Sequence, residues 1–181
     1  FENIPQGDYA IRITKAGHPE TVGNMTVSDS DVVYNVTLRE YKFGQTVQIR
    51  LIEPWGLKAN VRVHDGVVDH VDYSALYDYG VYFIRASELS VSDPTQDNVS
   101  VSDIVGDSDA VHLNKANGVT VNSTVLTATY DKGLYTYEFG DSVFVLFYIV
   151  PYEGAERIYA PIRERNLSEL VNARKDDTDD F

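Results

Sequence analysis

Apolar and polar residues alternate along most of the chain, or the apolar residues run together in short stretches. Alternation is typical of half-buried β-strands, and short continuous apolar stretches are typical of strands in a core. Clear apolar stretches lie at residues 47–52, 79–84 and 143–150, and Gly, Pro, Asp and Asn residues separate the stretches. The pattern predicts roughly eight to ten strands at the spacing of a β-sandwich.

The predicted fold is therefore all-β, an antiparallel β-sandwich of the immunoglobulin-like or jelly-roll-like kind. We assign residues 32–175 to this sandwich, which would open with a half-buried strand over residues 32–40. Residues 1–31 are expected to form an arm or a small hairpin, an element that can add a strand to a neighbouring sheet. Residues 176–181 form an acidic tail, expected to be loose.

Two short stretches predict helical structure. Residues 74–78 resemble one helical turn capped by Ser74, with Gly80 placed to end it in a left-handed conformation. The sequence Asn166-Leu167-Ser168-Glu169 resembles a capping motif. It predicts a short C-terminal helix that covers a sheet edge.

Turn-forming residues predict the connections. The pair at residues 65–66, Asp-Gly, indicates a tight hairpin with residues 67–71 as its returning strand. Residues 88–117 carry the weakest pattern and are expected to form a long surface loop. Further strands are predicted over residues 119–130, 135–139 and 158–162.

Charge and composition remove several classes of partner. The chain carries 28 acidic and 15 basic residues, a net charge of −13 at pH 7. A polyanion repels nucleic acid and anionic lipid, so we expect neither as a partner. No apolar run approaches the length of a membrane span, so membrane insertion is not expected. The absence of cysteine excludes a disulfide scaffold and Cys-ligated zinc.

The chain lacks the sequence motifs of most enzyme classes. It has no nucleotide-binding loop and no Gly-x-Ser-x-Gly nucleophile elbow. Glycoside hydrolysis requires two facing carboxylates, but 28 acidic residues allow many arbitrary pairs. His64 and His70 flank the predicted 65–66 turn, an arrangement more typical of surface histidines than of metal ligands. We therefore do not expect an enzyme.

Calcium is the best-motivated cofactor. Asp103, Asp107 and Asp109 follow one another on the predicted surface loop. Calcium takes several oxygen ligands, which an acidic loop can supply. The alternative is a solvated acidic loop with no bound ion.

Aromatic residues suggest a second kind of site. Tyrosine supplies 13 of the aromatic side chains, against 7 Phe and 1 Trp. Trp55 lies at a predicted bend, and Tyr73, Tyr77 and Tyr79 lie close together in sequence. Exposed aromatic rings can stack on sugars, whereas buried rings would only fill the core.

Three stretches carry a resemblance to a known family. They are Arg-Leu-Ile-Glu-Pro-Trp-Gly-Leu at residues 50–57, Asp-Tyr-Ser-Ala-Leu-Tyr-Asp-Tyr-Gly-Val-Tyr-Phe at residues 72–83, and Gly-Asp-Ser-Val-Phe-Val at residues 140–145. These stretches resemble the Ig/fibronectin-like β-sandwich modules of large surface proteins from gut and rumen Firmicutes, modules that phages of these bacteria also carry. The resemblance extends over residues 48–163. It implies a sandwich fold and an extracellular location on a cell or virion surface.

The function expected from these observations is a non-enzymatic structural or adhesive surface module. Such a module would assemble with itself or with other protein subunits through sheet edges and tyrosine-rich surfaces. The alternative is a carbohydrate-binding module that uses Trp55 and the nearby tyrosines to bind glycans.

Overall fold

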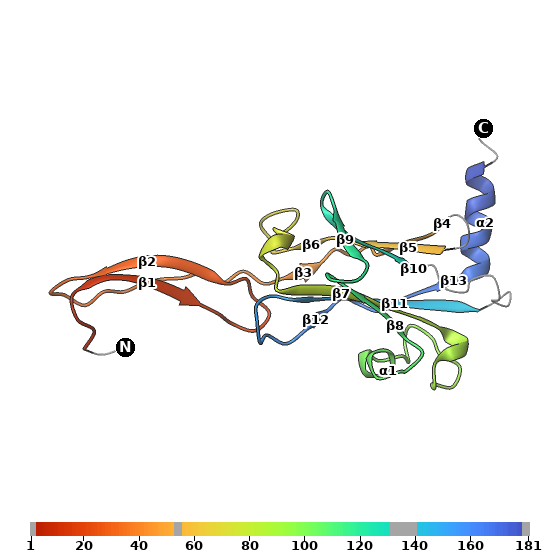
Figure 1. The fold of residues 1–181 in the computed structure, drawn as a ribbon, viewed down its shortest axis with the longest axis horizontal. Helices are drawn as coiled ribbons and strands as arrows, with labels where there is room; N and C mark the ends of the chain where they lie inside the picture. The colour runs from red at the N-terminus through yellow and green to blue at the C-terminus, as the bar shows by residue number, and fades with distance from the viewer. Residues whose placement is uncertain (1–2, 53–55, 131–140, 179–181) are drawn as a thin grey trace.

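The computed structural model of the protein describes residues 3–52, 56–130 and 141–178, with side chains up to residue 173. In these ranges two antiparallel sheets form the body of the molecule, and a two-stranded hairpin extends from one end of it (Figure 1). Helical structure is limited to short segments and one C-terminal helix. The predicted all-β sandwich, with an added N-terminal strand segment and a short C-terminal helix, is confirmed.

The first sheet contains four antiparallel strands. Their order is β4 (Gln48–Ile52), β5 (Gly56–Val61), β10 (Val125–Tyr130) and β9 (Val119–Asn122). Apolar residues alternate along β5, and those on one face are all buried in the core, namely Leu57, Ala59 and Val61. Val63, in the next short strand, continues the same buried set.

The second sheet forms the other layer of the sandwich. Its strands are β12 (Ile158–Tyr159), β11 (Ser142–Val150), β7 (Asp78–Arg85) and β8 (Val111–Asn114), with β13 (Arg163–Asn166) paired to the start of β11. Alternate residues of its two central strands pack against the first sheet: Tyr79, Val81, Phe83, Val143, Val145, Phe147 and Ile149. The main core therefore lies between the two sheets.

The second sheet is buried on both faces. All nine residues of β11 are buried. The side chains that point away from the first sheet form a second apolar cluster, which includes Tyr82, Ile84, Phe144, Leu146, Tyr148 and Val150. A strand covered on both faces needs apolar residues at every position, which explains the unbroken apolar run of β11.

A third layer covers this outer face, and the prediction of a long surface loop over residues 88–117 is wrong in part. The segment contains α1 (Val101–Val105) and β8, and the short 3-10 helix η2 (Ala86–Glu88) precedes it. It buries Leu89, Val99 and Ile104 against the second sheet. The three apolar residues are spaced irregularly along the chain, so periodicity does not reveal them.

The predicted hairpin at residues 65–66 is also wrong, because residues 67–71 form no strand. The carboxylate of Asp65 accepts hydrogen bonds from the backbone N–H groups of Val67 (2.9 Å) and Val68 (3.0 Å). These local hydrogen bonds turn the chain, so residues 67–71 do not pair as a returning strand. Only Val71 returns, where its N–H donates to the carbonyl of Val63 at 2.9 Å.

The helical turn near residue 74 is present but shifted. It is the 3-10 helix η1 (Tyr73–Ala75), and its N-cap is Asp72 rather than Ser74. Asp72 Oδ1 accepts from the Ser74 backbone N–H at 2.9 Å and from the Ser74 hydroxyl at 2.6 Å. Ser74, the predicted cap, therefore donates hydrogen bonds to Asp72, the observed cap.

Gly80 does not end this turn in a left-handed conformation; it lies inside β7, opposite Tyr148 of β11. A Cβ atom at Gly80 would overlap the ring of Tyr148. Glycine is required there by close packing rather than by backbone conformation.

The elements after residue 118 agree more closely with the predictions from the sequence. The stretch 119–130 is divided into β9 and β10 by a turn in which Ser123 has a φ of 56°. The predicted strand over residues 135–139 lies outside the described residues. The C-terminal helix is confirmed as α2 (Leu167–Thr178), where Asn166 Oδ1 accepts from the backbone N–H groups of Ser168 and Glu169. Residue 176, where the acidic tail was predicted to start, lies within this helix.

Residues 3–40, which we call the arm, extend away from the sandwich (Figure 1). The arm contains the antiparallel hairpin of β1 (Gly7–Ile13) and β2 (Thr21–Val27), and residues 32–40 then return along it without forming the predicted strand. Tyr34 lies over Gly23, so this return crosses the face of the hairpin instead of pairing with its edge. A small ladder of β3 (Lys42–Phe43) and β6 (Val63–His64) joins the arm to the sandwich.

Candidate functional site

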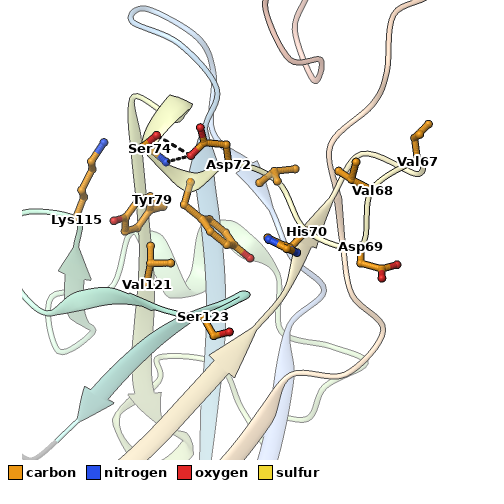
Figure 2. A pocket seen from close by; sticks show the side chains of 12 residues that line it. Val67, Val68, Asp69, His70, Asp72, Ser74, Tyr79, Lys115, Val121 and Ser123 are labelled. Atoms are coloured by element: carbon orange, nitrogen blue, oxygen red, sulfur yellow. Dashed lines mark hydrogen bonds between the residues drawn. The ribbon is translucent and has the colours of Figure 1, made fainter.

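A groove of about 1040 Å³ lies at the end of the sandwich that carries the arm, and Figure 2 shows the side chains that line it. We call it the tyrosine groove. Its walls come from the loop of residues 67–72, from η1, and from the turn between β9 and β10. It is lined by Val67, Val68, Asp69, His70, Val71, Asp72, Tyr73, Ser74, Tyr79, Lys115, Val121 and Ser123. The exposed valines at residues 67, 68 and 121 make its rim apolar.

Tyr73 is a structural residue of this groove. It is buried, and its hydroxyl accepts a hydrogen bond from the backbone N–H of Val63 at 3.0 Å and donates one to the carbonyl of Thr124 at 2.9 Å. Burial raises the pKa of the Tyr73 hydroxyl, which therefore stays protonated. The residue links three segments of the chain, and its ring packs edge to face with the ring of Tyr79, with 6.4 Å between the centroids.

The structure does not form a shared stacking platform from the predicted tyrosines. Tyr79 is buried like Tyr73, and Lys115 Nζ lies 5.5 Å from its ring centroid. Tyr77 is 54% exposed and lines a different groove of about 640 Å³ at the base of the arm, with Tyr152, Arg12 and Glu153 among its walls. Trp55 lies outside the described residues.

The three aspartates proposed for calcium are used separately. Asp103 forms a capping box at the start of α1, where its carboxylate accepts from the Ser100 backbone N–H at 2.8 Å and from the Ser100 hydroxyl at 2.6 Å. These bonds lower the pKa of Asp103. Asp107 accepts from the backbone N–H of Asp109 at 2.9 Å. Across the residues the structure describes, no three acidic or histidine side chains gather into a group that would hold a metal ion.

Sequence reasoning missed a polar cluster on the outer face of the second sheet. The Tyr148 cluster consists of Asp78, Tyr82, His112, Tyr148 and Arg157. Tyr148 donates its one hydroxyl hydrogen to Asp78 at 3.1 Å, so His112 Nε2 is the donor to Tyr148 at 2.9 Å. The His112 ring stacks on Tyr82 at 4.4 Å between centroids. The guanidinium of Arg157 lies 4.4 Å from the Tyr148 ring centroid and donates to the Tyr82 hydroxyl at 2.6 Å.

The electrostatics of the Tyr148 cluster keep its hydrogen bonds in place. Burial raises the pKa of Tyr148, and the negative charge of Asp78 raises it further. Burial lowers the pKa of His112, and the positive charge of Arg157 adds to this, while Asp78 opposes it. Both side chains are therefore neutral near pH 7. The cluster connects three strands of one sheet, β7, β8 and β11, with Arg157 just before β12, so its observed bonds serve the fold. The sequence gave one signal for it, a tyrosine within the unbroken apolar run of β11.

The arm presents a different kind of surface. None of residues 3–40 is buried. Besides Gly7 at its start, the strand register places seven uncharged residues on one side of the hairpin, which we call the apolar arm face: Tyr9, Ile11, Ile13, Thr21, Gly23, Met25 and Val27. These side chains are all half-exposed. The charged side chains of Asp8 and Arg12 lie on the opposite side of β1.

In the described part of the chain, a hydrogen bond and an ion pair fix the arm to the sandwich at its base. The backbone N–H of Tyr41 donates to the carbonyl of Gly17 at 3.0 Å, and Arg39 forms an ion pair with Asp65 at 3.1 Å. Figure 1 shows the far end of the hairpin extending away from the two sheets.

Comparison of the chain with protein-family models, with curated proteins and with solved structures finds no match. None of the helices in the described ranges has both the length and the apolar character that a membrane crossing requires.

Proposed function

We propose that the protein is a non-enzymatic structural module of a cell or virion surface, which joins a neighbouring β-structure through its arm. The observation that carries this proposal is the absence of any buried side chain in residues 3–40. A two-stranded hairpin with an apolar side is at best marginally stable alone in water, so the arm needs a partner to bury that side. An extracellular location rests on the family resemblance of residues 48–163.

The remaining architecture suits a rigid support. The second sheet is buried on both faces, and the Tyr148 cluster bonds its strands together through side chains as well as backbone. Tyr73, which lines the tyrosine groove, has both hydrogen-bonding functions of its hydroxyl occupied by the protein's own backbone. These features favour a supporting role over catalysis.

The proposal is tested by removing residues 1–31 and by assaying the full chain for turnover. Since no arm residue is buried, we expect the thermal midpoint of the sandwich to change by no more than about 3 °C. We expect no hydrolysis of ester, peptide or glycoside substrates. A large loss of stability would make the arm part of the sandwich core, and robust turnover would replace the structural role by an enzymatic one.

A carbohydrate-binding module is the second candidate, and exposed Tyr77 favours it. This ring borders the 640 Å³ groove at the base of the arm, together with Tyr152 and the charged groups of Arg12 and Glu153. An aromatic ring beside hydrogen-bonding groups is the usual composition of a sugar site. A glycan array separates the candidates: binding that Tyr77→Ala abolishes would support this function, and an array without hits would remove it.

A further inference from the structure

The arm also indicates which partner it takes, an inference that rests on the proposed joining role. We propose that two copies of this chain pair along the open edges of their β1 strands. The two strands run antiparallel, in the register that places Asp8 of each copy opposite Arg12 of the other. The two hairpins then form one four-stranded sheet in the order β2-β1-β1-β2, shared by both copies.

One edge of β1 is open for this pairing. In the described part of the chain β1 pairs only with β2, and residues 32–40, which return along the arm, form no strand. The other edge of β1 therefore carries unpaired backbone groups over about 23 Å. Natural sheets rarely leave such an edge exposed, because it invites pairing with another strand.

The sequence of β1 is complementary to itself when two copies run antiparallel. With Ala10 opposite Ala10 of the second copy, all seven residues of β1 overlap. Asp8 then lies opposite Arg12, and this pair occurs twice because the arrangement is two-fold symmetric. Tyr9 lies opposite Ile11 on the other side of the sheet, also twice. Opposite charges and aromatic–aliphatic pairs directly across a ladder both stabilise it.

Other registers lose this match. A shift by one residue places the apolar arm face of one copy beside the charged side of the other, because side chains alternate along a strand. A shift by two residues places Ala10 opposite Asp8 or Arg12. A shift by four places Asp8 opposite Asp8, or Arg12 opposite Arg12, and like charges directly across a ladder are destabilising. The charges of β1 therefore select one register.

Both charged side chains are placed to reach a second copy. Asp8 is exposed, and its Oδ1 accepts a hydrogen bond from the Thr26 hydroxyl at 2.7 Å, which leaves Oδ2 for a further bond. Arg12 has a side chain that is 72% exposed, and its Nε contacts Glu20 at 2.7 Å. This contact leaves the two terminal nitrogens of the guanidinium as donors.

Pairing gives the arm what a single hairpin lacks. A sheet of three or more strands with an apolar face can be stable by itself, whereas a two-stranded hairpin is marginal. Arg12 lines the groove at the base of the arm together with Tyr152, so it marks the end of β1 nearest the sandwich. Antiparallel pairing therefore places the two sandwiches at opposite ends of the shared sheet. Its length of about 23 Å exceeds the screening length of about 8 Å at physiological ionic strength, which limits repulsion between the two acidic bodies.

The first test measures the mass of the 181-residue chain by light scattering over a range of concentrations. We expect the mass to rise from one chain towards two between about 1 and 300 µM, as for a small interface. Over the same range the amides of β1 should exchange about 10-fold more slowly with solvent, while those of β7 and β11 do not change.

Two charge reversals test the register. Asp8→Arg places two positive charges opposite each other in both cross-strand pairs, and Arg12→Asp places two negative charges there. Each variant alone should weaken the dissociation constant about 30-fold. An equimolar mixture of the two variants should dimerise again, because every pair then joins one Arg to one Asp. Lys15→Asp, just after β1, is the control for the change in net charge and should leave the dissociation constant within about 3-fold.

Three results would overturn the inference. They are a chain that stays monomeric at about 300 µM, a dimer that the two reversals weaken no more than Lys15→Asp does, and a mixture of the two reversals that stays monomeric. Each of these would remove the second copy, or this register, and leave the proposed joining role to be met by another β-structure. Turnover, or a sandwich that unfolds without residues 1–31, would instead contradict the proposed function itself.

Discussion

The arm and the sandwich are built from similar strand patterns but reach opposite outcomes. β1 and β2 alternate apolar and polar residues, and none of their side chains is buried. β5 also alternates, and its apolar positions are buried completely. The difference is the presence of a second layer. Alternation determines which side of a strand is apolar, and packing against another layer is what stabilises it.

The largest expected effect comes from the same substitution, Ile→Ala, made once in the sandwich and once in the arm. Ile149→Ala in β11 removes a completely buried side chain and should lower the free energy of unfolding by about 3 kcal/mol. Ile11→Ala in β1, where the side chain is half-exposed, should cost less than about 1 kcal/mol. Urea denaturation followed by circular dichroism measures both. Equal losses would show that the arm and the sandwich unfold as one unit with a shared core.

A second comparison uses two glycines that each lie beneath a tyrosine. A Cβ atom at Gly80 would overlap the ring of Tyr148, and at Gly23 it would overlap Tyr34. Tyr148 is completely buried and bonded to Asp78, so Gly80→Ala should cost about 2 kcal/mol through overpacking.

Gly23→Ala is the matched control, because Tyr34 is exposed enough to turn aside. Its expected cost is less than about 1 kcal/mol in the same denaturation experiment. A larger loss at Gly23 than at Gly80 would mean that the arm is the more tightly packed region.

The tyrosine groove allows a smaller and more specific test. Tyr73→Phe leaves the backbone N–H of Val63 and the carbonyl of Thr124 without this partner, and should lower the free energy of unfolding by about 1.5 kcal/mol. Tyr77→Phe, at the exposed neighbour, should change it by no more than about 0.5 kcal/mol. Similar values for both would show that the Tyr73 hydroxyl does not hold the groove together.

The smallest effect concerns pH. The pKa of His112 is lowered in the folded state, first by burial and then by Arg157, against a weaker opposite effect of Asp78. The unfolded chain therefore binds the proton first as the pH falls below about 6.5, and the folded state loses stability through that range. His112→Gln should make the free energy of unfolding less dependent on pH between about 7 and 5. His18→Gln, in the arm, is the control, and an equal flattening there would contradict a special role for His112.

Prediction from the sequence worked best where a strand has one clear inner side. The alternating face of β5 and the cap of α2 at Asn166 were both predictable from periodicity and local hydrogen-bonding residues. The prediction failed where a side chain binds the backbone N–H groups that would otherwise pair with a neighbouring strand. Asp65 draws the N–H groups of Val67 and Val68 away from a returning strand, and the rule for Asp-Gly hairpins does not take this into account.

The candidate sites were harder to predict than the fold. Tyr73, Tyr77 and Tyr79 are close in sequence, yet two are buried and only Tyr77 is exposed. Asp103 and Asp107 are close as well, yet each is bonded within its own turn. Proximity in sequence shows which residue types lie near one another along the chain. The direction of each side chain depends instead on the strand or turn that carries it.

The sequence by itself determined the fold class, the apolar side of most strands and the acidic surface, because these depend on local periodicity and on composition. Only the tertiary structure decided which apolar faces are covered. It showed that residues 86–110 form a third layer over Tyr148 and that the apolar arm face has no such layer among the described residues. Both results depend on contacts between segments far apart in the chain, and the pattern along a single strand carries no information about what lies opposite it.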